Sequence, residues 1–312
     1  MNERTGTAVV FPGMGPTAFA DVGRFMLTNA HARELTSVAD DVLGYSLLDR
    51  FRAGGDYSEA AQVAFLVNCL ALARWAEDEY GVTPDFCVGP SFGEKPLVGH
   101  VGALPVPDTI RLTARLARCL EEYFATEHQD VVTHSFVRTP EPVLRELLAE
   151  LDARGEWYDI SCYVDDDFYM VSLREGSLDR LTTRLRAAGG MSLYTMRPPM
   201  HSAAFGPLRD RIAAEVLDGL AFADPRVPVV ADQDGSLVTT GAGVATMLLD
   251  SVVRPLRWPD VVASLVERGV GTVYVCGPDR LFGRVPATTR HVEVVAVNPR
   301  SAMRPRRHAQ LG

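Results

Sequence analysis

The chain has 312 residues, of which 47% are hydrophobic and 23% are charged, and its net charge is −9. This composition is typical of a globular protein with a substantial core and one large or two smaller domains. An acidic chain without a basic stripe is poorly suited to nucleic-acid binding. No segment approaches the ~20 continuous apolar residues of a membrane span, and the apolar run at the N-terminus is too short for a secretory signal. We therefore expect a cytoplasmic protein.

Strands and helices alternate in the first part of the chain. Residues 7–11 are a β-branched run closed by Pro12 and Gly13, which predicts a strand and a turn. Residues 59–79 carry apolar side chains at helical spacing and end near Gly81, so they predict a mostly buried helix. Residues 85–88 predict a strand, residues 89–94 a turn, and the next residues another helix. This alternation is typical of a parallel sheet covered on both faces.

The middle of the chain has a different pattern. We predict strands at 131–138, 158–164, 168–173 and 191–196, and helices at 141–155 and 177–189. This βαββαβ order is that of a ferredoxin-like unit. After it we predict a helix at 207–217, a strand at 227–231, helices at 245–253 and 258–269, and a strand at 272–277.

The order of these elements predicts an α/β protein in which a small domain interrupts a large one. The large domain comprises residues 1–128 and 197–295, the small domain residues 129–196, and the tail residues 296–312. The cleft between the two domains is the expected place for a ligand.

Five cysteines are scattered through the chain without a CxxC pair: Cys69, Cys87, Cys119, Cys162 and Cys276. An odd number at these spacings indicates neither a disulfide framework nor a zinc site. We expect buried free thiols and no metal site.

Residues 89–94, Gly-Pro-Ser-Phe-Gly-Glu, contain a GxSxG pattern between a predicted strand and a predicted helix. The glycines permit a tight turn from which Ser91 projects, and the first amides of the helix point to the same place, where they can stabilise an oxyanion. The pattern is short, so a glycine-rich turn with an incidental serine is the alternative.

A serine hydroxyl is a weak nucleophile unless a base is at hand, and that base must come from elsewhere in the chain. Of the seven histidines, His201 stands where the chain re-enters the large domain at the expected cleft. The other six are more simply explained as surface or packing residues.

Several motifs in one order resemble the acyl-carrier-protein acyltransferases, the family of malonyl-CoA transacylase and of the acyltransferases of polyketide synthases. The motifs are FPGMG at 11–15, Gln62, GPSFGE at 89–94, MHSAAF at 200–205, RPLRW at 254–258 and VYVCGP at 273–278. The resemblance runs from residue 9 to about residue 283. It implies an α/β-hydrolase-like large domain with a ferredoxin-like insert.

The resemblance also implies how the site works. Ser91 is then the nucleophile and His201 its general base, which a backbone carbonyl near Arg254 orients. The backbone amides of Met14 and Phe92 form the oxyanion hole. The acyl group passes from one acyl carrier protein to another through an acyl-serine, carried on phosphopantetheine, and no bound cofactor or metal is needed.

Departures from the family pattern describe the substrate pocket. Carboxyacyl-selective members have an arginine 25 residues after the serine, and this chain has Leu116 there. A buried carboxylate without a cation costs several kcal/mol, so we expect a non-carboxylated acyl group. Pro90 before the serine, Met200 before the histidine and Gln62 complete the expected pocket.

The alternative is a one-residue deletion in the loop before this helix, which would place Arg115 at the family's arginine position. Leu112, Leu116 and Leu120 form one apolar stripe, and Arg115 would point about 100° away from it. This pattern favours Leu116 at the pocket.

The expected pocket resembles that of free-standing acyltransferases of macrolactam antibiotic biosynthesis, such as that of vicenistatin, which move an aminoacyl or dipeptidyl starter between carriers. The alternatives are a malonyl-CoA:acyl carrier protein transacylase, an editing thioester hydrolase and a non-catalytic docking protein.

Carrier proteins are acidic, so a chain of negative net charge must meet them with a local positive patch. The candidates beside the cleft and in the small domain are Arg154, Arg300, Arg304, Arg306 and Arg307, each of which taken alone is more simply a solvated surface residue. We expect a monomer.

Overall fold

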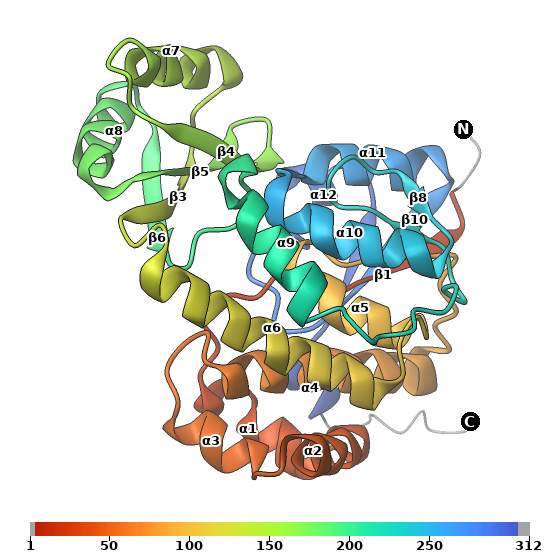
Figure 1. Cartoon of the computed structure of the whole chain (residues 1–312). Coiled ribbons are helices and arrows are strands. Elements are labelled where there is room, and N and C mark those ends of the chain that lie inside the picture. The colour runs from red at the N-terminus through yellow and green to blue at the C-terminus, as the bar shows by residue number, and fades with distance from the viewer. Residues whose placement is uncertain (1–3, 305–312) are drawn as a thin grey trace.

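The computed structural model describes residues 4–304 and contains two sheets (Figure 1). The larger sheet has six strands in the order β11-β10-β1-β2-β7-β8. These strands are β1 (Gly6–Val10), β2 (Phe86–Val88), β7 (Val229–Val230), β8 (Leu237–Val238), β10 (Val270–Cys276) and β11 (Glu293–Val297). All pairs are parallel except β7 with β8, so the carboxyl ends of the parallel strands meet at one edge, where a ligand site is expected.

Helices cover both faces of the large sheet. Neighbouring residues of β1 point to opposite faces, so Val9 packs into one buried cluster and Val10 into another. The first cluster takes side chains from α1 (Phe19–Thr28), α2 (Ala30–Leu43), α3 (Leu47–Ala53), α4 (Glu59–Tyr80), α5 (Glu94–His100), α6 (Val106–Thr126), α9 (Gly206–Glu215) and α10 (Gly241–Val253). The second takes them from α11 (Trp258–Glu267) and α12 (Pro286–Thr289).

Helix α4 is mostly buried, as its apolar sequence predicts. It begins after Ser58, whose hydroxyl accepts a hydrogen bond from the amide of Ala61 at 3.3 Å. It ends at Gly81, whose φ of 64° is the left-handed conformation that glycine adopts readily. The capped start holds the preceding residues Asp56 and Tyr57, which line the cavities at the candidate site.

The second sheet has five strands in the order β6-β3-β5-β4-β9. Strands β3 (Val131–Val137), β4 (Tyr158–Asp165), β5 (Phe168–Arg174) and β6 (Met191–Met196) are antiparallel, and α7 (Glu141–Asp152) and α8 (Glu175–Ala187) cover one face (Figure 1). This is the predicted βαββαβ unit, and with the large parallel sheet it confirms the predicted fold class. Strand β9 (Leu256–Arg257) comes from the large part of the chain and pairs with β4, which joins the two units.

The structure differs from the sequence-based expectation at both ends of the large domain. The stretch between the first strand and α4 folds into helices α1, α2 and α3, which the sequence did not suggest. Strand β11 pairs with β10 and runs to Val297, so the large sheet continues past residue 295, and α13 (Pro299–Ala302) follows it. The proposed tail therefore begins inside the sheet.

All five cysteines are buried and unpaired. Within residues 4–304, no helix is long and apolar enough to cross a membrane. The same residues hold no group of three or more His, Cys, Asp or Glu side chains that could bind a metal ion together.

Candidate active site

Ser91 lies in a tight turn at the carboxyl end of β2. Its φ is 55°, a left-handed conformation that costs a non-glycine residue on the order of 1–3 kcal/mol. Both flanking glycines are required by close backbone contacts: a Cβ at Gly89 would lie 2.2 Å from the carbonyl oxygen of Gly93, and a Cβ at Gly93 would lie 2.0 Å from that of Phe11. The turn passes into the 3₁₀ segment η1 (Ser91–Gly93) and then α5.

Ser91 and His201 are hydrogen-bonded to each other, with 2.8 Å between Ser91 Oγ and His201 Nε2. The other ring nitrogen, Nδ1, lies 2.6 Å from the backbone carbonyl oxygen of Ser251. Because a carbonyl only accepts, Nδ1 carries the proton and Nε2 is left to accept the proton of the serine hydroxyl. A carbonyl near Arg254 was expected in this position, and the structure places Ser251 there, in the last turn of α10.

The imidazole of His201 is held in its neutral form. The residue is only 7% exposed, and burial lowers the pKa of His201 to about 4, while the hydrogen bond to Ser251 opposes this shift and the charge of Lys95 adds to it. A neutral imidazole that accepts from a serine hydroxyl is the form that a general base requires.

The amides of Met14 and Phe92 remain free to donate. Within residues 4–304 neither one donates a hydrogen bond to another group. Met14 belongs to the loop that follows β1, and it lines the same cavity as Ser91. Phe92 directly follows the serine in the turn. Two unused donors beside a serine are what an oxyanion hole needs.

A cavity of about 600 Å³ lies between the two sheets, and Ser91 and His201 open into it. The loop of residues 13–16 forms one wall, and β6 with parts of β3, β4 and β5 forms the opposite wall. Its apolar lining includes Met14, Phe168, Met170, Met200 and Leu256. A cavity is thus present between the two sheets, where the element order predicts a ligand site.

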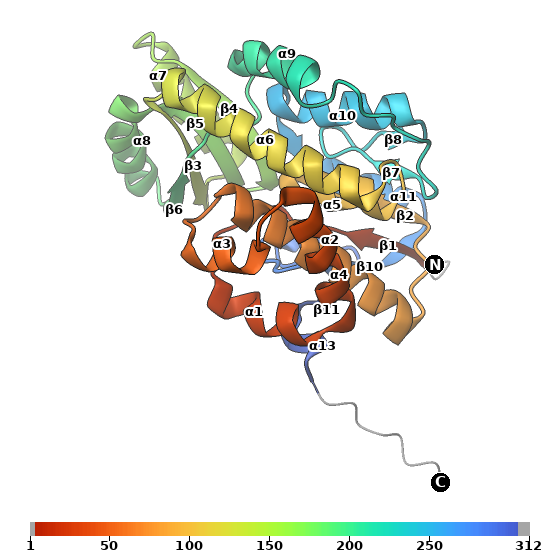
Figure 2. The same cartoon turned by 60° about the horizontal axis from the view of Figure 1, so that its bottom comes forward.

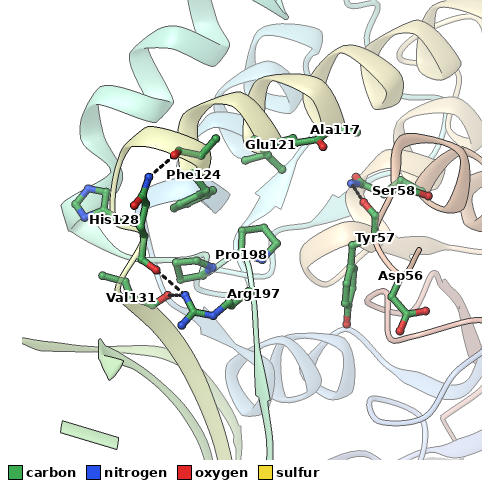
Figure 3. Close-up of a pocket in the computed structure, with 15 residues that line it drawn as sticks. Asp56, Tyr57, Ser58, Ala117, Glu121, Phe124, His128, Val131, Arg197 and Pro198 are labelled. Carbon is green, nitrogen blue, oxygen red and sulfur yellow. Dashed lines mark hydrogen bonds between the residues drawn. The ribbon is translucent and has the colours of Figure 1, made fainter. Parts of the chain in front are cut away.

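A second cavity, of about 470 Å³, adjoins the first (Figure 3). The two share Asp56, Tyr57 and Arg197 in their walls. In Figure 3, Ala117, Glu121 and Phe124 reach it from α6, and Tyr57 lies on the opposite side. Arg197 donates hydrogen bonds to the carbonyl oxygens of Gln129 and Val131 at 2.7 and 3.3 Å, so its position is fixed (Figure 3).

The residues expected in the substrate pocket take different places. Met200 lines the first cavity, and Gln62 lines the second, where its Nε2 donates to the carbonyl of Tyr57 at 2.8 Å. Pro90 is buried in the turn without lining either cavity. Leu116 points inward and is 8% exposed, but it packs in the core and not on a cavity wall. Arg115 is exposed.

The structure does not bring the candidate carrier-binding arginines together. Arg154 is exposed just after α7, and Arg300 and Arg304 are exposed in and after α13. Figure 2 shows α7 and α13 at opposite ends of the molecule, and none of these three arginines lines either cavity. The expectation that Arg300 and Arg304 border the cleft is therefore not met. Arg306 and Arg307 lie outside the described residues.

Asp232 is not among the residues predicted for the site, yet its side chain accepts a hydrogen bond from the backbone amide of Ser91 at 2.6 Å. A signal for it was available, because Asp232 follows the predicted strand 227–231. In the structure, β7 is parallel to β2 with Val230 opposite Val88, so both strands deliver their next residues to the same edge.

Comparison with known proteins supports the same interpretation of the fold. Residues 135–196 match the family model of the VinK acyltransferase small domain. The chain is 23% identical to the malonyl CoA-acyl carrier protein transacylase of Bacillus subtilis, over 93% of each chain, and 24% identical to that of Escherichia coli K12, over 96% of this chain and 98% of the relative.

Comparison with solved structures finds the same fold. A malonyl-transacylase in complex with its type II polyketide synthase acyl-carrier protein gives a TM-score of 0.84 at 23% identity, covering 96% of this chain and 97% of that one. The malonyl CoA-acyl carrier protein transacylase of Coxiella burnetii gives 0.82 at 22% identity, covering 96% of both chains. In fold and sequence this chain is thus similar to the malonyl-CoA:acyl carrier protein transacylases, and residues 135–196 match the family model of the VinK acyltransferase small domain.

Proposed function

We propose that this protein transfers an acyl group between acyl carrier proteins through an acyl-Ser91 intermediate. The observation that carries the proposal is the hydrogen-bonded series of Ser91 Oγ, His201 and the Ser251 carbonyl at the wall of the interdomain cavity. Names of the relatives, which are acyl carrier protein transacylases, support the same class of reaction.

The reaction has two half-reactions with His201 as the only base. In the first, His201 Nε2 takes the proton of Ser91 as Oγ attacks the thioester carbonyl; the carbon–sulfur bond breaks, and the leaving thiol takes the proton. In the second, a carrier thiol gives its proton to His201 and attacks the acyl-serine, and Ser91 regains the proton as it leaves. The Met14 and Phe92 amides would hold the oxyanion, each worth roughly 3 kcal/mol in the transition state.

Phosphopantetheine on a carrier protein would bring the acyl group, and the proposed steps use no metal or resident cofactor. The structural neighbour that contains an acyl-carrier protein together with its transacylase supports a carrier protein as the partner. A cytoplasmic location and a monomeric state remain predictions from the sequence.

We further propose that the acyl group carries no free carboxylate. The described arginines that line the first cavity are already paired: Arg197 with Glu175 at 2.7 Å, and Arg280 with Asp21 at 3.7 Å. Leu116 stands at the family's arginine position, and the exposed Arg115 does not replace it. A carboxylate beside the dyad would have to take one of these arginines from its acidic partner or stay buried without a cation, which costs several kcal/mol.

The second cavity supports a long acyl group with a basic end, such as an aminoacyl or dipeptidyl starter of macrolactam biosynthesis. Its walls include the carboxylates of Asp56 and Glu121 (Figure 3), which make no hydrogen bond or ion pair within residues 4–304. Gln62 is 9% exposed, and its side-chain carbonyl also lacks a partner there. These are acceptor groups, which suit an ammonium or amide and repel a carboxylate.

Malonyl transfer is the second candidate, because the curated relatives are named for it. Intact-mass spectrometry separates the two: the protein is incubated with malonyl-CoA and with carriers loaded with acetyl, aminoacyl or dipeptidyl groups, beside a Ser91→Ala control. We expect an adduct from the amine-bearing acyl groups, none from malonyl-CoA, and none on the control. A rapid malonyl adduct on Ser91 would replace the first candidate by the second.

The same experiment tests the remaining alternatives. A second carrier thiol is added to the acylated protein, and product on the carrier is compared with free acid. Mainly free acid would indicate an editing hydrolase. Transfer that survives Ser91→Ala would indicate a non-catalytic docking role.

A further inference from the structure

Beneath the Ser91 turn lies a buried cluster of charged side chains: Glu94, Lys95 and Asp232. They are 1%, 8% and 2% exposed. Lys95 is the only lysine of the chain, whose other basic side chains, histidines aside, are arginines. Lysine has a long, charged side chain that usually lies at the surface. Here it is used once, in the interior and beside the nucleophile. The transfer mechanism proposed above does not use any of the three groups.

Asp232 touches the nucleophile's backbone directly. Its Oδ2 accepts the amide hydrogen of Ser91 at 2.6 Å, and its Oδ1 is buried without a hydrogen-bond partner. The bond joins the ends of β2 and β7, and it holds a residue whose φ of 55° is unfavourable without support. An ionised carboxylate is the stronger acceptor for such a strained amide.

Lys95 is placed to act on this carboxylate through space. Its ammonium lies 5.5 Å from the centre of the Phe92 ring and makes no ion pair within 4.0 Å in the described residues. Burial raises the pKa of Asp232 to about 6, and the Ser91 amide, Lys95 and Arg254 each oppose that rise. Burial raises the pKa of Glu94 well above its usual range, and Gln233 donates to Glu94 at 3.2 Å. Burial lowers the pKa of Lys95 from its ordinary value, and the charges of Glu94 and Asp232 oppose this shift.

We propose that Asp232 is a positioning residue that fixes the backbone of Ser91, and that the buried ammonium of Lys95 keeps Asp232 ionised. This inference rests on the proposed function, because it concerns the same nucleophile. It predicts that the reactivity of Ser91 depends on a proton bound to Asp232 as well as on His201. The charged or titratable groups that act on Asp232 or His201 are Glu94, Lys95, Cys162 and Arg254.

The test follows the rate at which a serine-directed fluorophosphonate labels Ser91 between pH 4.5 and 9, measured by intact mass on the full chain. In the native protein the rate should fall as Asp232 takes up its proton near pH 6. Asp232→Asn keeps a carbonyl acceptor but cannot ionise, so this step in the profile should vanish. Asp232→Ala removes the acceptor and should slow labelling roughly 10- to 100-fold at every pH.

Lys95→Met tests the second half of the inference. Without the ammonium the carboxylate of Asp232 is less favoured, so the step should move to higher pH. Asp218→Asn, which changes an exposed carboxylate before β7, is the matched control and should leave the profile unchanged. A step that persists in Asp232→Asn, or that stays in place in Lys95→Met, overturns the corresponding half.

A measurement without activity keeps the inference separable from the proposed function. Protein produced with ¹³C at lysine Cε gives one lysine signal in NMR, that of Lys95. The signal should shift in a step near pH 6 in the native protein, and the step should be absent in Asp232→Asn. Identical pH courses in both proteins would overturn the inference. Failure of the native protein to label would instead overturn the proposed function, whatever Lys95 does.

Discussion

At the scale of single residues, the proposed selectivity depends on the position 25 residues after the proposed nucleophile. Leu116 is directed inward and Arg115 outward, so the helix offers no cation to a buried carboxylate. The sequence pattern favoured this orientation because apolar residues recurred at helical spacing around Leu116. What the pattern could not tell is that Leu116 packs in the core and not on a cavity wall.

Two substitutions test this assignment. Arg115→Leu should leave the acyl selectivity unchanged, because its side chain is exposed. Leu116→Arg puts a longer side chain one helical turn before Leu120, which lines the second cavity, and it should allow malonyl-CoA to acylate Ser91 at least 10-fold faster than in the native protein, because the guanidinium can pair with the carboxylate. Both are measured by intact mass over time, and circular dichroism monitors folding of Leu116→Arg. Acylation of the native protein by malonyl-CoA that is lost in Arg115→Leu would show that Arg115 reaches the acyl group.

At the scale of elements, the strand-turn-helix around Ser91 depends on the close approach of two backbones. The Cβ of an alanine at position 93 would meet the carbonyl oxygen of Phe11 at 2.0 Å, where β1 ends and the Met14 loop begins. The contact joins the turn that carries the nucleophile to the loop that carries one of the two free amides.

Gly93→Ala should therefore separate the turn from this loop. We expect a loss of stability of about 1–3 kcal/mol from overpacking, together with a larger loss of Ser91 labelling than the lost stability explains. Thermal unfolding and fluorophosphonate labelling measure the two effects. Gly176→Ala is the control, because a Cβ there meets nothing within 4 Å. Full labelling of Gly93→Ala would contradict the required contact.

At the scale of the whole molecule, the surface for the proposed carrier is what the sequence located least well. Arg154 and Arg300 were both expected to meet an acidic carrier, yet they belong to opposite ends of the molecule (Figure 2). A small carrier that delivers its arm to one cavity can meet only one of them.

Reversing the charge at Arg154 and at Arg300 in separate variants tests which of the two meets a carrier. For a given carrier, only one of Arg154→Glu and Arg300→Glu should lower kcat/KM for acylation, by roughly 3- to 30-fold and less at high salt, because steering of charged partners is screened. Acylation by a small thioester without a carrier is the internal control and should not change in either variant. Equal rates for both variants and the native protein would exclude these arginines from docking.

The sequence by itself determined the fold class and pointed to Ser91 and His201 as a pair. Strand, turn and helix around Ser91, and the βαββαβ order of residues 131–196, are encoded in contiguous residues through periodicity and glycine spacing. The sequence did not predict short strands such as β9 and β11 or the three helices of residues 19–53. Brief or weakly patterned segments take their structure from what they pack against.

Only the tertiary structure decided which partners complete the site. Ser251 is 50 residues from His201, and Asp232 is 141 residues from Ser91. Neither contact leaves a local pattern: one uses a backbone carbonyl, which every residue has, and the other depends on β7 lying beside β2. Local sequence fixes which groups are available, and packing of distant segments fixes which of them meet.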